Sequence, residues 1–76
     1  MNKTDKDQLE VYKQTLQELI NNIEAMADAE QEKFDNLNEG MQAMERFQKL
    51  TENADTLYTA QEQLQEAFET LEELEQ

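Results

Sequence analysis

A C-terminal stretch whose apolar residues recur at helical spacing decides the fold. Residues 50–74 read LTENADTLYTAQEQLQEAFETLEEL. Steps of four and three residues alternate along one row, which is the a/d spacing of a helix that packs along a single seam. The row consists of Leu50, Ala54, Leu57, Gln61, Leu64, Phe68 and Leu71. The stretch predicts a long amphipathic helix, in which the polar Gln61 is a candidate for setting register or oligomeric state.

The rest of this stretch is acidic and contains no base, because the last Lys or Arg of the chain is Lys49. Four glutamates are spaced four, three and four residues apart, so they should share one face of the helix. They are Glu62, Glu66, Glu69 and Glu73, and Asp55 extends the set toward the middle of the chain. We interpret this set as a candidate partner-binding face.

The composition supports an all-α fold in a single domain of residues 1–76. The chain has no Pro, no Cys, no His and one Gly, and Gln, Glu, Leu and Ala are abundant. These abundant residues favour helices, whereas β-branched aliphatic residues are few. No disulfide or thiolate metal site can form without Cys.

The first half of the chain predicts a long helix at about residues 5–35. Thr4 is a suitable N-cap, and Asp7 follows it by three residues in a pattern that resembles a capping box. Apolar residues then recur at helical spacing, although the a/d row fails at Glu30 and Lys33 and the stripe moves to Ala27 and Phe34.

We expect a turn at residues 36–40, followed by a second helix at about residues 41–74. Asn and Gly cluster at this turn, and both residue types accept left-handed backbone conformations. An alternative places a kink near residues 50–55, because capping-type residues gather there. Those residues are Thr51, Asn53 and Asp55. The expected architecture is an antiparallel helical hairpin.

A chain of 76 residues is short for a stable fold, and one hairpin seam cannot fully bury its large apolar residues. We therefore expect a homodimer, as a four-helix bundle or coiled coil. The residues expected to form the dimer or packing stripe are Leu16, Ile23, Phe47, Leu50, Leu57, Leu64, Phe68 and Leu71.

The residue types exclude several functions. Without His, the commonest general base and metal ligand is missing, so we expect no enzymatic activity, no cofactor and no metal site. Nineteen acids and six bases give a net charge of −13, which would repel a nucleic-acid backbone. We find no apolar run of membrane-spanning length and no signal peptide, and we expect a cytoplasmic protein without a membrane partner.

The predicted corner reads FDNLNEGMQ at residues 34–42 and is followed by Glu45 and Arg46. This segment resembles a group of small acidic helical proteins of bacteriophages and mobile elements, whose corner tends to read F-D-N-L-P-E-x-x-Q. This chain has Asn38 where that group has Pro. The resemblance implies a phage or prophage setting, and hence the host cytoplasm, rather than a specific activity.

Three interpretations of the function of this chain remain. The first is an inhibitor that imitates nucleic-acid phosphates and occupies a basic surface of a nucleic-acid-handling or defence protein. The second is a structural or chaperone-like adaptor that binds a partner helix through its apolar stripe. The third is an acidic surface that serves solubility alone. Like charges at helical spacing destabilise a helix, which favours a selected function for the array.

Overall fold

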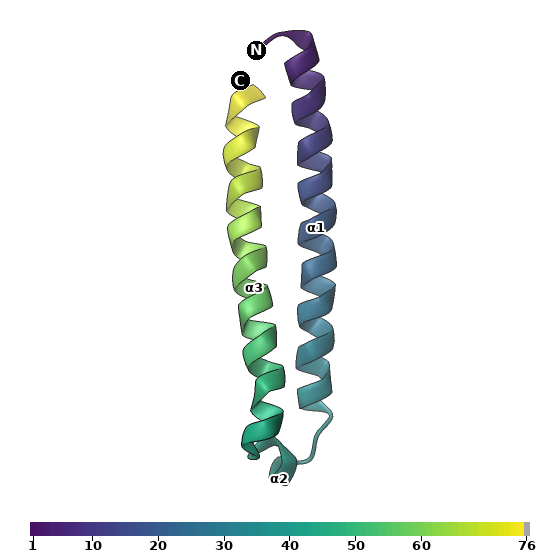
Figure 1. Ribbon diagram of the computed structural model, residues 1–76, viewed down its shortest axis with the longest axis vertical. Helices are drawn as coiled ribbons and strands as arrows, with labels where there is room; N and C mark the ends of the chain where they lie inside the picture. The colour runs from purple at the N-terminus through teal and green to yellow at the C-terminus, as the bar shows by residue number, and fades with distance from the viewer. Residues whose placement is uncertain (76) are drawn as a thin grey trace.

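A computed structural model describes residues 1–75 and confirms the all-helical class. The elements are α1 (Lys3–Asp35), α2 (Glu39–Gln42), α3 (Glu45–Glu72) and the 3₁₀ turn η1 (Glu73–Glu75). The long helices α1 and α3 lie side by side and run in opposite directions, so that both ends of the chain lie at the same end of the molecule (Figure 1). The molecule is a rod with extents of 59 × 15 × 15 Å.

Helix α1 begins two residues earlier than the sequence predicts. Asn2 is the N-cap, and its Oδ1 accepts a hydrogen bond from the backbone N–H of Asp5 at 2.8 Å. The prediction that Thr4 caps this helix is therefore wrong. Asn caps a helix as well as Ser and slightly better than Thr. With Asn2 satisfying the first free N–H groups, the helix extends through Thr4.

The corner between the long helices contains the short helix α2. The Asn38 side chain accepts a hydrogen bond from the N–H of Met41 at 2.9 Å and caps this helix. Gln42 closes the corner by donating from Nε2 to the carbonyl oxygens of Phe34 and Leu37, at 3.2 and 3.1 Å. The expected left-handed backbone is absent, because Gly40 lies within α2 and no residue of the described chain has a positive φ.

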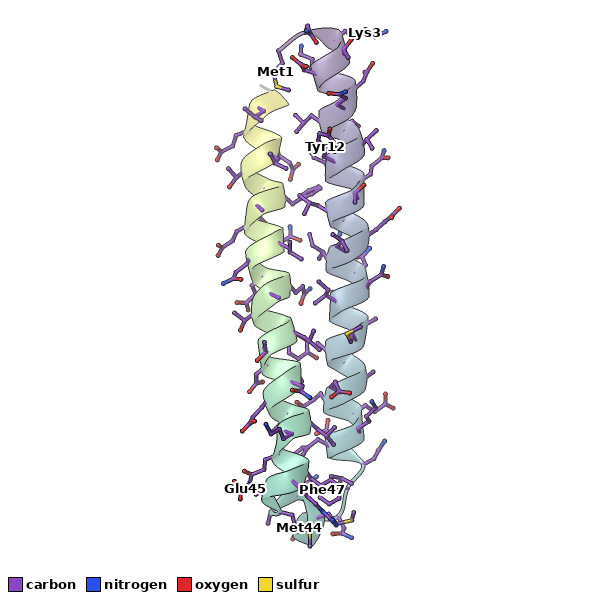
Figure 2. The ribbon with its side chains drawn as sticks, viewed as in Figure 1. Met1, Lys3, Tyr12, Met44, Glu45 and Phe47 are labelled. Carbon is purple, nitrogen blue, oxygen red and sulfur yellow. The ribbon has the colours of Figure 1, made fainter. Side chains whose placement is uncertain are left out.

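Helix α3 continues through residues 50–55, where the sequence suggested a kink. The break lies earlier, at residues 43–44, and Met44 precedes the helix without a side-chain cap. Met44 and Phe47 lie at the corner end, where α2 joins α3 (Figure 2). The capping-type residues at 50–55 do not end the helix because two of their side chains bond across to α1. Thr51 Oγ1 donates to Gln31 Oε1, and Asn53 Nδ2 donates to Glu30 Oε2, both at 3.3 Å.

Helices α1 and α3 pack along two rows of positions spaced alternately four and three residues apart. One row runs from Leu9 to Phe34 on α1, and the other from Leu50 to Leu71 on α3. Four apolar residues of the described chain are buried, Leu9, Ile20, Ala27 and Ala54, and all four belong to these rows. Every residue of the predicted packing stripe is only half-buried: Leu16, Ile23, Phe47, Leu50, Leu57, Leu64, Phe68 and Leu71. Two helices therefore leave much of the stripe in contact with water.

The seam row of α1 does not fail at Glu30 and Lys33, contrary to the sequence-based expectation, because Glu30 belongs to the row and Lys33 lies off it. Alternating steps of four and three run unbroken from Leu9 to Phe34, and Glu30 and the buried Lys13 occupy two of the positions. A periodicity defined by apolar residues alone misses charged members whose partners lie on the same molecule.

Candidate partner-binding face

The five acidic residues predicted from the sequence are all exposed. Four of them lie on α3, whereas Glu73 begins η1 and lies just beyond the α-helix. The five are Asp55, Glu62, Glu66, Glu69 and Glu73. Gln65 Nε2 donates to Glu69 Oε1 at 3.4 Å, which holds one of these carboxylates without neutralising it.

Two carboxylates of α1 join this surface. Gln61 Nε2 of α3 donates to Glu24 Oε2 at 2.9 Å, and the hydroxyl of Tyr58 donates to Asp28 Oδ1. Gln61 and Glu62 also line a shared hollow with Gln65 and Glu66. We call the resulting surface the acidic face, defined as Glu24, Asp28, Asp55, Glu62, Glu66, Glu69 and Glu73.

Sequence reasoning missed the contribution of α1. Glu24 and Asp28 are four residues apart and therefore share a side of α1. Which side of α3 they would meet depends on the relative rotation of the two helices, and that rotation is visible only in the cross-helix hydrogen bonds.

The carboxylates near Tyr58 disfavour the loss of its phenolic proton. The hydrogen bond to Asp28 raises the pKa of Tyr58 above its ordinary value of 10.0, and partial burial raises it further. The charges of Asp28, Glu24 and Asp35 act in the same direction, because each disfavours a phenolate nearby.

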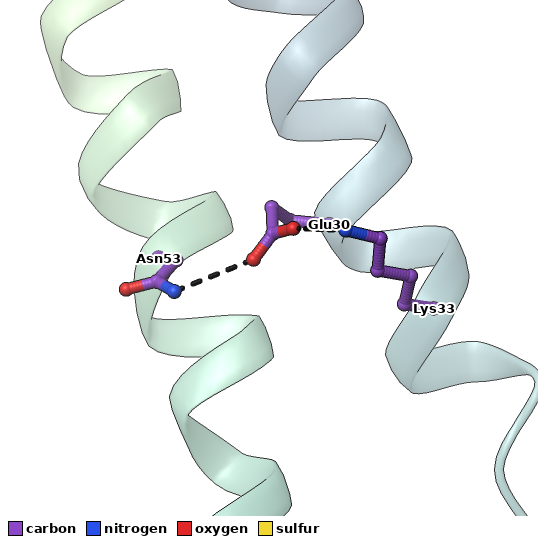
Figure 3. A network of polar contacts seen from close by, with 3 residues as sticks. All are labelled: Glu30, Lys33 and Asn53. Atoms are coloured by element: carbon purple, nitrogen blue, oxygen red, sulfur yellow. Dashed lines mark hydrogen bonds and ion pairs between the residues drawn. The ribbon is translucent and has the colours of Figure 1, made fainter.

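On the opposite side of the seam, Glu30 is held by two donors. Lys33 Nζ lies 2.8 Å from Glu30 Oε1, and Asn53 Nδ2 of α3 donates to the other oxygen (Figure 3). The hydrogen bond from Lys33 and then that from Asn53 lower the pKa of Glu30 from 4.5, against a smaller opposing effect of burial. This carboxylate is compensated within the chain, unlike those of the acidic face.

Lys13 occupies the seam near the end of the rod that holds the chain termini. Its side chain is buried, and its Nζ lies 5.5 Å from the centre of the Phe68 ring, within cation–π range. One of the six bases of the chain is therefore used for packing between α1 and α3.

The pockets on the surface of this rod are open rather than enclosed. One groove of about 370 Å³ is lined by Met26, Glu30, Asn53, Thr56 and Leu57. Among residues 1–75, no three carboxylates gather in a geometry that could hold a metal ion. No helix in the same range is long and apolar enough to cross a membrane.

Comparison of the chain with protein-family models, with curated proteins and with solved structures finds no match.

Proposed function

We propose that the chain is a non-enzymatic acidic interaction protein that imitates nucleic-acid phosphates and occupies a basic surface of another protein. The target would be a nucleic-acid-handling or defence protein in the cytoplasm of a host, with the chain encoded by a phage or mobile element. The observation that carries this proposal is the acidic face, whose α3 carboxylates are all exposed. The sequence contains no Lys or Arg after Lys49 that could neutralise them locally.

The cost of this arrangement supports a selected role. Glu62, Glu66 and Glu69 are like charges at helical spacing, which destabilises a helix. Glu73 lies at the C-terminal end, where the helix dipole disfavours an anion. Lys at these positions would favour the fold on both counts.

The density of charge also suits a phosphate mimic. The net charge of −13 on a rod 59 Å long is about one charge for every 4.5 Å of its axis, compared with about 3.4 Å per phosphate along one DNA strand. A basic groove that accommodates a nucleic-acid strand would meet charge of the same sign, and of the same order of density, on the acidic face.

A second candidate function rests on the half-buried stripe. Leu50, Leu57 and Leu64 remain partly exposed on α3, so an adaptor that binds a partner helix through this stripe is the alternative. Salt distinguishes the two: a phosphate mimic should release its partner as ionic strength rises, whereas an apolar contact should hold or tighten.

We further propose that the two-helix arrangement persists in solution as a hairpin and that two copies pair into a four-helix bundle. The half-buried seam supports this, because a second copy would remove the remaining apolar surface from water.

The proposal is tested by capturing host proteins at low salt on the immobilised chain and eluting them with rising NaCl. Replacing four carboxylates, Glu62→Gln, Glu66→Gln, Glu69→Gln and Glu73→Gln, should abolish capture of the partner and leave the helices intact or more stable. DNA or RNA added to the parent should displace the captured protein, because both would occupy the same basic cleft.

The matched control changes four other exposed carboxylates, Glu10→Gln, Glu18→Gln, Glu32→Gln and Glu45→Gln. It alters the net charge equally, so binding should survive if the position of the charges matters. Equal loss in both variants would indicate a general effect of charge. Unchanged binding of the first variant at physiological salt would refute the mimic, and failure of a Leu50→Asp variant instead would favour the adaptor.

A further inference from the structure

Three large apolar side chains of α1 are exposed in a line. Tyr12, Leu19 and Met26 are spaced seven residues apart and have exposed fractions of 59, 46 and 58%. Seven residues are nearly two helical turns, so these side chains share one side of α1. That side is opposite the one on which Glu24 and Asp28 bond to α3, because Met26 lines a groove with Glu30 and Asn53 on the other side of the seam.

A matching line runs along α3 and into η1. Ala60, Ala67 and Leu74 repeat at the same spacing, and Asn53 precedes them by seven residues. Met26 and Asn53 line the same groove, which places the two lines on the same side of the rod. We call this surface the open face, defined as Tyr12, Leu19, Met26, Ala60, Ala67 and Leu74.

The open face is free of carboxylates over most of its length. The adjoining positions, residues 8, 15, 22 and 29 of α1 and residues 56, 63 and 70 of α3, hold only Gln, Thr, Asn and Ala. Glu30 is the one acid in the groove on this side, and Lys33 and Asn53 already bond its carboxylate. In a chain with nineteen acids, this is a pronounced separation of charged and uncharged sides.

We propose that the open face is the surface on which a second copy of this chain docks. Two chains that each carry a charge of −13 can approach only where their carboxylates do not meet, and the open face satisfies this condition for both copies at once. Its apolar lines each span fourteen residues, or about 21 Å of helix axis. An interface of about 800 Å² per partner would therefore also include the half-buried seam residues beside these lines, such as Leu16, Ile23, Leu57 and Leu64.

The charges at one end of the open face set the orientation. Lys33, Arg46 and Lys49 continue its lines at the corner end, seven residues beyond Met26, Asn53 and Thr56. A parallel pair would oppose these three cations to their own copies, and like-charge juxtaposition is strongly disfavoured. An antiparallel pair separates the cations of the two copies. It brings the three cations of each copy toward the terminal end of the other copy, where Asp5 lies seven residues before Tyr12 on the same line.

This orientation makes specific contacts. Leu19 is the middle residue of α1, so it lies at the two-fold axis beside Leu19 of the second copy. Tyr12 then comes opposite Met26 of the second copy, seven residues to either side of that axis. Thioether–aromatic contacts of this kind are favourable.

The inference rests on the proposed pairing but not on the phosphate-mimic function. Sedimentation equilibrium should show a pair for the parent, and Leu19→Glu should weaken it about tenfold or more, as central interface residues do. The matched control is Val11→Glu, because Val11 is also on α1, is 57% exposed and faces away from the seam. It should leave the pair unchanged. A monomeric parent, or equal effects of the two substitutions, would overturn the inference.

A second measurement remains informative if Leu19→Glu does not fold. A spin label on Glu32→Cys, at an exposed position outside the open face in a chain that has no other Cys, reports the distance between copies. Thirteen residues on each side of the axis place the two labelled backbones about 39 Å apart in the antiparallel pair. A distance under about 20 Å would show a parallel pair and overturn the orientation, and no dipolar coupling would overturn the pair. A monomer that still captured its basic partner would refute the pairing alone.

Discussion

Lys13 and Glu30 are charged residues at seam positions, and each is accommodated by its neighbours. Lys13 lies over the Phe68 ring, which favours a cation, and its long aliphatic stem packs in the seam. Glu30 keeps its charge because Lys33 and Asn53 donate to both of its oxygens. These positions preserve the periodicity of the seam without adding apolar surface.

We predict that Tyr58 titrates above pH 10.0, because its neutral hydroxyl donates to Asp28 and its phenolate would face several carboxylates. The folded-state pKa lies above the unfolded value, so this contribution to stability is complete below the unfolded pKa. It is lost as pH rises through the folded pKa. Phenolate absorbance in a Tyr12→Phe variant isolates Tyr58. Asp28→Asn in that background should bring the pKa back toward 10.0, and titration at or below 10.0 before this change would refute the contact.

The residues that sequence reasoning assigned to capping show which features depend on the fold. Asn2 rather than Thr4 caps α1, and Thr51 and Asn53 donate to α1 instead of ending a helix. Ser, Thr, Asn and Asp bond to whichever group lies nearest. The sequence shows that such residues are present, but the nearest group is known only once the helices are placed.

At the scale of the elements, the corner is built by side chains and does not require a special backbone conformation. Asn38 has φ −71°, a value that Pro also adopts. The Pro of the phage-like pattern would therefore fit this backbone, and Asn38 supplies a side-chain cap that Pro cannot. The departure from that pattern exchanges a rigid start of α2 for a hydrogen-bonded one.

We predict opposite effects for two substitutions in this corner. Asn38→Ala should lower the free energy of unfolding by about 1 kcal/mol, because the N–H of Met41 loses its acceptor. Gly40→Ala should raise the free energy of unfolding by up to about 1 kcal/mol, because Gly40 is helical and Ala favours a helix. The added Cβ would lie 3.4 Å from Asn38 Oδ1, which is an ordinary contact and not a clash.

Thermal unfolding at one fixed chain concentration measures both, with about 4–8 °C expected per kcal/mol in a domain of this size. Asn38→Asp, which keeps an acceptor, should behave like the parent. A destabilised Gly40→Ala variant would show that the corner needs a glycine after all.

The long helices themselves were predictable because their signals are local. Alternating steps of four and three residues run through all of α3, and neither Pro nor an interior Gly interrupts it. The break at residues 43–44 was not predictable from such signals, because Met44 is neither a capping residue nor a helix breaker. The break comes directly after the corner, where Gln42 bonds back to the carbonyl oxygens of Phe34 and Leu37 and the chain turns into α3.

For the whole molecule, the central feature is that charge is divided between two sides of a narrow rod. The α3 part of the acidic face followed from residue spacing, because exposure is expected for charges opposite an apolar row. The contributions of Glu24 and Asp28 and the existence of the open face required the pairing of α1 with α3. In the proposed pair, the acidic face would repel the second copy and the open face would admit it.

The most direct test of this division follows both associations in one sample. Sedimentation velocity of the chain mixed with its captured partner would be recorded from low salt to about 0.5 M NaCl. At that salt concentration the Debye length is only a few ångströms, so charges on the surface are largely screened. We predict that the partner dissociates as salt rises, while a species of twice the 9.0 kDa chain mass persists or strengthens. A partner that stays bound at high salt, or a pair that separates together with the partner, would contradict the account.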